Sequence, residues 1–96
     1  MLKEINVETL KAWLASNQAV LIDVREPYEY AQQNIAEAIL LPLSEVCVAA
    51  LPDLQGKKLV IHCRSGMRSA NACAALLAED PDLDVYNLAG GILAWS

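Results

Sequence analysis

The chain has 96 residues, of which 55% are hydrophobic and 20% charged, and its formal net charge is −5. This length and balance predict a single compact domain over residues 1–96 and exclude a disordered chain. The acidic charge and the lack of a lysine- and arginine-rich cluster argue against a nucleic-acid partner.

The first half of the chain predicts three strands, each followed by a helix. The strands are expected in three short apolar runs, at residues 3–6, 19–24 and 38–41. Asn6 is expected to cap the first helix, and Pro27 stands in the first turn of the second, where the helix needs no N–H donor. Ser44 is expected to cap a third helix, which carries Val46 and Leu51 on its apolar face.

The second half predicts two more strands with their helices. A strand over residues 59–62 leads through a short loop into an alanine-rich helix over residues 68–79. A last strand over 85–88 leads to a short helix that follows Gly91 and contains Trp95. This alternation of strands and helices favours an α/β fold with a mainly parallel sheet.

Three cysteines occur, with no CxxC spacing, and His62 is the one histidine. An odd count without regular spacing does not predict a disulfide framework or a zinc site. Cys47 and Cys73 lie among apolar residues at helical spacing and are expected in the core. The start of the chain lacks the pattern of a signal peptide, and no apolar run approaches a membrane span. The expected location is cytoplasmic, without a membrane partner.

The segment around Cys63 carries the strongest chemical signal. Cys63 stands where a strand is expected to end, which is where ligands bind in parallel α/β sheets. The chain then enters a helix N-terminus, whose unpaired N–H groups favour an anion, and Gly66 allows the backbone to curl. Arg64 and Arg68 add positive charge in an acidic protein. These groups predict a lowered pKa for the Cys63 thiol and hence a reactive thiolate.

Three other polar residues near strand ends are interpreted as structural. His62 directly precedes Cys63 in a strand, so its side chain should point to the opposite face of the sheet. It is therefore expected to pack rather than to act as a general base. Asp23 and Arg25 stand near the carboxyl end of another strand, and a structural ion pair is favoured over a role in bracing the loop.

Three segments together resemble the signatures of rhodanese domains. They are residues 21–30 (LIDVREPYEY), residues 63–69 (CRSGMRS) and residues 89–95 (AGGILAW), in family order. The resemblance spans nearly the whole chain and implies a five-stranded parallel sheet with helices on both faces. By resemblance, Cys63 is the catalytic nucleophile. The implied substrate-binding residues follow it: Arg64, Ser65, Gly66, Met67, Arg68 and Ser69.

The resemblance also implies a reaction. Family members take a sulfane sulfur from a small anionic donor, often thiosulfate, onto the loop cysteine and pass it to cyanide, a thiol or a sulfur-accepting protein. The amides of the residues from Arg64 to Ser69 would form the cradle, and Arg64 and Arg68 would orient the donor. No metal or organic cofactor is implied.

Two other functions compete with this one. Cysteine-dependent phosphatases and arsenate reductases also place a cysteine in an amide-lined loop, but their signature has five residues between cysteine and arginine. Here Arg68 comes one position early, and a smaller loop suits a sulfur atom better than a phosphoryl group. A non-catalytic binding module or a sulfur carrier is the second alternative, which the presence of Cys63 weakens.

Overall fold

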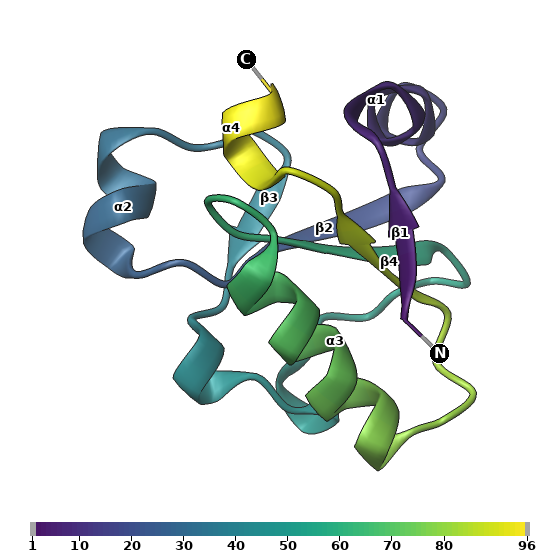
Figure 1. Ribbon diagram of the computed structural model, residues 1–96. Coiled ribbons are helices and arrows are strands. Elements are labelled where there is room, and N and C mark those ends of the chain that lie inside the picture. The colour runs from purple at the N-terminus through teal and green to yellow at the C-terminus, as the bar shows by residue number, and fades with distance from the viewer. Residues whose placement is uncertain (1, 96) are drawn as a thin grey trace.

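The structure is a computed structural model and describes residues 2–95. Its centre is a five-stranded parallel sheet in the order β1-β5-β4-β2-β3 (Figure 1). The strands are β1 (Lys3–Ile5), β2 (Ala19–Asp23), β3 (Ala38–Leu40), β4 (Lys58–His62) and β5 (Val85–Leu88). All five strands fall within about two residues of the positions expected from the sequence, and the α/β fold class is confirmed.

Helices cover both faces of the sheet, as expected. They are α1 (Val7–Ala15), α2 (Pro27–Gln32), α3 (Met67–Glu79) and α4 (Gly91–Trp95). Figure 1 shows α3 on one side of the sheet and α1 and α4 on the other. The Asn6 side chain caps α1 by accepting a hydrogen bond from the Thr9 amide (2.8 Å). No helix within residues 2–95 combines the length and the apolar character needed to cross a membrane.

Strand alternation divides the core into two layers. The α3 face buries Ile22 and Ile61 of the sheet against Leu76 of the helix. The opposite face buries Val60 against Leu10 of α1, together with residues of α4. Because successive side chains of a strand point to opposite faces, Cys63 lies on the α3 side.

The prediction of a helix after Ser44 is wrong. The segment instead forms two short 3₁₀ turns, Leu43–Glu45 and Val48–Ala50, and Ser44 caps neither. Between them the backbone at Val46 is extended, with ψ at 120°. β-branched residues at 46 and 48 disfavour a helix, and Pro52 restricts the residue before it. Packing of Val46 on the α3 face of the core then outweighs the weak helical preference.

Candidate active site

Cys63 follows the last residue of the central strand β4 and lies directly before the loop that leads into α3. Its side chain is 1% exposed, and its sulfur faces the start of α3. The amide of Gly66 donates a hydrogen bond to Sγ (3.1 Å), as does the amide of Ser69 (3.4 Å). The Ser69 hydroxyl lies 3.3 Å from the same sulfur. Two of the amides expected to form the cradle, together with one hydroxyl, therefore donate to the sulfur.

The loop is curled by a glycine and held by the end of the chain. Gly66 has φ at +110°, a conformation that side chains other than glycine rarely adopt. On the far side of the loop, the Ile92 amide donates to the Cys63 carbonyl (2.9 Å) and the Leu93 amide to the Arg64 carbonyl (3.2 Å). These bonds turn the loop's carbonyls toward α4, which leaves its N–H groups to face the sulfur.

Two opposing effects act on the pKa of the Cys63 thiol. Burial alone would raise it, since a thiolate loses hydration in the interior. Hydrogen bonds from the Ser69 hydroxyl and from the amides of Ser69, Gly66 and Ser65 favour the thiolate. Their sum is larger, so the pKa lies below that of an ordinary thiol. A lowered pKa makes Cys63 a candidate nucleophile near neutral pH.

The two loop arginines differ in their surroundings. Arg68 donates to both carboxylate oxygens of Glu29 on α2, at 2.7 and 2.9 Å. This bidentate bond lowers the pKa of Glu29 to about 2 and raises the pKa of Arg68. The Arg64 side chain has no hydrogen-bond or ion-pair partner within residues 2–95 and lines a cavity. Of the two, Arg64 therefore has the guanidinium that a ligand can approach without breaking an ion pair.

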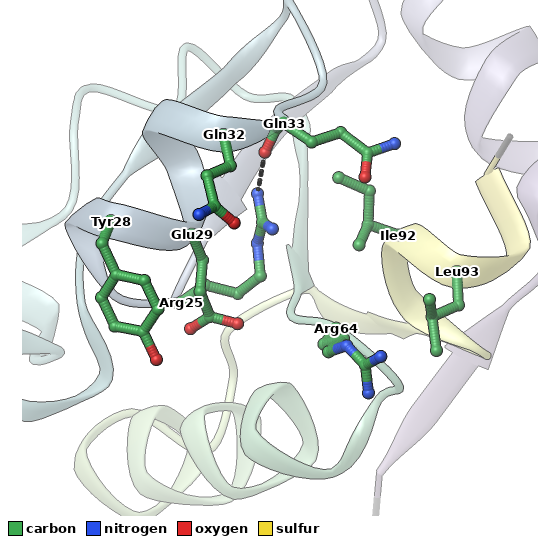
Figure 2. Close-up of a pocket in the computed structure, with 8 residues that line it drawn as sticks. All are labelled: Arg25, Tyr28, Glu29, Gln32, Gln33, Arg64, Ile92 and Leu93. Carbon is green, nitrogen blue, oxygen red and sulfur yellow. Dashed lines mark hydrogen bonds between the residues drawn. The ribbon is translucent and has the colours of Figure 1, made fainter.

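A cavity of about 550 Å³ lies beside the loop, between α2 and α4 (Figure 2). Tyr28 and Glu29 project from the α2 side and Leu93 from the α4 side, with Arg64 between them. Cys63 itself is not part of the lining. The cavity thus opens next to Arg64, the residue directly after Cys63. Its volume is larger than a cyanide or thiosulfate ion requires.

The remaining loop residues take different positions. The Ser65 amide helps to lower the pKa of Cys63, whereas Met67 directs its side chain to solvent and is 75% exposed. Ser69 is fully buried. The part that Met67 was expected to play in substrate binding therefore rests on its backbone. The substrate-binding roles of the loop stay predictions.

A buried ion pair braces the end of β2, as the sequence suggested. Arg25, 4% exposed, donates to both carboxylate oxygens of Asp23 and to the Gln33 carbonyl (2.6 Å). His62 points away from the sulfur's face of the sheet, and its Nε2 lies 3.5 Å from Asp23. Burial lowers the pKa of His62, which outweighs the attraction of Asp23. The imidazole is thus a neutral packing group at physiological pH.

The other two cysteines lie apart from this chemistry. Cys73 is fully buried on the core-facing side of α3, and burial raises the pKa of its thiol to about 12. Cys47 is partly exposed in the segment of 3₁₀ turns. Cys73 is a core residue as expected, while Cys47 packs less completely than the sequence pattern suggested.

Sequence reasoning missed three residues that shape the site. They are Glu29, which holds Arg68; Gly91, which lets α4 approach the loop; and Asn87, which contacts Ser69. Asn87 left a readable signal, because it is a lone amide in the otherwise apolar strand β5. Its partners, however, are 18 to 83 residues away along the chain.

These features define a class: a small α/β protein with a cysteine in an amide-lined loop at the end of the central strand. Comparison with known proteins is more specific. The family described as the rhodanese-like domain matches residues 6–96. A sulfurtransferase of Allochromatium vinosum is 40% identical over 97 residues, which cover 100% of this chain and 90% of that protein.

Two further similarities bear on fold and length. The structure of the human single-domain sulfurtransferase TSTD1 has a TM-score of 0.85 and 27% identity, covering 99% of this chain and 96% of that one. A protein of Synechocystis sp. is 38% identical over 92% of this chain, which spans only 49% of that relative. The chain therefore belongs to the rhodanese-like domain family, and its named relatives support a sulfurtransferase activity.

Proposed function

We propose that this protein transfers a sulfane sulfur by way of a persulfide on Cys63. The observation that supports it best is the set of donors around one sulfur: two amides at 3.1 and 3.4 Å and a hydroxyl at 3.3 Å. Donors in this arrangement stabilise a thiolate before the reaction and again when the thiolate is released. The lowered pKa of Cys63 favours the thiolate, so the proposed attack relies on these donors rather than on a separate general base.

The reaction has two displacement steps. The Cys63 thiolate attacks the outer sulfur of thiosulfate, the bond between the two donor sulfurs breaks, and sulfite leaves with the electron pair. Cyanide or a thiolate then attacks the outer sulfur of the enzyme persulfide. The bond to Sγ breaks, and its electron pair stays on Cys63 as the thiolate. Alternate binding of donor and acceptor predicts ping-pong kinetics.

The arginines are assigned separate parts in donor binding. Arg64, which lines the cavity, attracts the sulfonate end of thiosulfate. Arg68 cancels the negative charge of Glu29 beside the loop and adds to the positive field at Cys63. Because both of its terminal nitrogens, Nη1 and Nη2, already bind a carboxylate, Arg68 is poorly placed to bind a phosphoryl group by two bonds. This pairing favours sulfur transfer over the phosphatase alternative.

Intact-protein mass spectrometry after thiosulfate treatment tests the proposal, with Cys63→Ser as the control. The wild type is expected to gain the mass of one sulfur, to lose it on addition of cyanide, and to give thiocyanate. The Cys63→Ser variant should fold normally and gain nothing. A wild type that takes up no sulfur, or a Cys63→Ser variant that takes up as much, would refute the persulfide.

The arginine assignment has its own test in steady-state kinetics. Arg64→Ala is expected to raise KM for thiosulfate with a smaller change in kcat, while Arg68→Ala exposes the Glu29 carboxylate and repels the donor. Adding Glu29→Gln to Arg68→Ala should restore part of the loss. No restoration would show that Arg68 contacts the donor itself rather than acting through Glu29.

A further inference from the structure

Asn87 is a buried amide that contacts the candidate active site from β5. It is 1% exposed, and its Nδ2 donates to the carbonyl of Gly66 (3.1 Å) and to Oε2 of Glu4 (3.1 Å). Both amide hydrogens are therefore used. Its Oδ1 faces the Ser69 hydroxyl in a very short hydrogen bond. The two donor bonds set the orientation of the amide, so that only an acceptor is presented to Ser69.

Ser69 cannot satisfy all of its neighbours at once. Its hydroxyl has one proton and two acceptors within reach, Oδ1 of Asn87 and Sγ of Cys63. The Ser69 side chain is fully buried, so no water molecule can supply another donor. A proton given to one acceptor is withheld from the other.

We propose that Asn87 is a positioning residue that competes with Cys63 for the single hydroxyl proton of Ser69. While the Cys63 sulfur is uncharged, as a thiol or in the persulfide, the hydroxyl points to Asn87. When the sulfur becomes a thiolate, the hydroxyl turns about its Cβ–Oγ bond and donates to Sγ. On ionisation the thiol proton passes to water, and no other bond breaks.

This competition suits a sulfur that must act in two opposite ways, and it rests on the proposed function. Cys63 is the nucleophile in the first displacement and the leaving group in the second. A thiolate that is stabilised too strongly leaves readily but attacks poorly, whereas one that is stabilised too weakly is seldom ionised. Because the hydroxyl must give up its bond to Asn87 before it donates to Sγ, its net stabilisation of the thiolate is smaller, which keeps the thiolate between these extremes.

Charged and titratable groups lie around Cys63 on several elements. None of them donates to Sγ in place of the Ser69 hydroxyl. Arg68 of α3 acts on the sulfur through its charge while paired to Glu29 of α2. His62 of β4 is neutral and lies near the Cys63 carbonyl rather than the sulfur. The other two are Cys73 of α3, a protonated thiol, and Glu4 of β1, which lies beyond Asn87.

The test is the pH dependence of Cys63 alkylation by iodoacetamide, assigned to Cys63 by peptide mass spectrometry. Asn87→Leu keeps the branching of the side chain at Cγ and removes the competing acceptor. The freed hydroxyl then serves the thiolate, so the midpoint of the alkylation profile should fall by about one pH unit. Loss of the bond to Gly66 would by itself loosen the cradle and raise the midpoint, so a purely structural role predicts the opposite direction.

A double-mutant cycle with Ser69→Ala isolates the competition. Ser69→Ala alone should raise the midpoint, and adding Asn87→Leu to it should then produce no fall, because no hydroxyl proton is left. The matched control is Asn71→Leu at an exposed position of α3, which should leave the profile unchanged. A midpoint that rises or stays constant in Asn87→Leu, or falls equally with and without Ser69, would overturn the inference.

Sulfur loading by thiosulfate is measured on the same samples by mass spectrometry. If the wild type loads sulfur and the midpoints do not follow the cycle, the inference about Asn87 fails while the proposed function stands. If the wild type does not load sulfur, the proposed function fails, and the alkylation midpoints still decide the inference about Asn87.

Discussion

Gly91 is the residue whose replacement tests most directly how α4 holds the loop. It has φ at +59°, and a Cβ at this position would meet the carbonyl carbon of Arg64 and the carbonyl oxygen of Cys63, each at 2.6 Å, as well as the Arg64 oxygen. These atoms are backbone and cannot rotate away. A methyl group therefore requires α4 to retreat from the loop.

The magnitude of Gly91→Ala follows from two contributions. A residue other than glycine in the left-handed conformation costs about 1–2 kcal/mol. Overpacking against fixed backbone adds about 1–3 kcal/mol. The total loss of unfolding free energy is about 2–5 kcal/mol, and the melting temperature should fall by roughly 10 °C or more for a domain of this size.

Gly56→Ala is the matched control. Gly56 has φ at +74°, but no atom lies within 4 Å of a Cβ built there. It carries the conformational contribution alone, about 1–2 kcal/mol. Urea unfolding of both variants measures the difference, which should be about 1–3 kcal/mol. Sulfur loading should slow in Gly91→Ala and not in Gly56→Ala. Equal losses in the two variants would refute the reasoning that α4 contact supports the loop.

Three further predictions concern charge and the third cysteine. The pKa of Glu29 falls from 4.5 to about 2 on folding, so its stabilising contribution is complete above pH 4.5 and is lost as pH falls through about 2; urea unfolding across this range should show the loss, and Glu29→Gln should flatten it. Arg25→Ala leaves the Asp23 carboxylate buried without its partner and should lower the unfolding free energy by about 3–5 kcal/mol, with partial recovery in a variant that also carries Asp23→Leu. Cys73, whose pKa is raised to about 12, should resist iodoacetamide at pH 8 until the protein is unfolded in urea; labelling of the folded protein would contradict its placement in the core.

Local pattern was sufficient for much of the fold and for the position of Cys63 at the start of the loop that leads into α3. Apolar runs predicted the five strands, and the run of loop residues after Cys63 predicted an amide-lined cradle at the start of α3. The expected opposite orientation of His62 held because strand alternation is a property of the backbone. The prediction of a helix after Ser44 failed because the helical preference of a nine-residue stretch between two prolines is weak. Packing therefore decided the shape of this segment.

By itself, the sequence determined which residues form strands, where Cys63 stands and which donors follow it within six positions, because these depend on neighbours along the chain. Only the tertiary structure decided which distant residues meet. Glu29 forms an ion pair with Arg68, Asn87 accepts a hydrogen bond from Ser69, and Gly91 lets α4 approach the backbone of Cys63 and Arg64. Those contacts join residues that are 18 to 39 positions apart, and sheet order with helix packing brings them together.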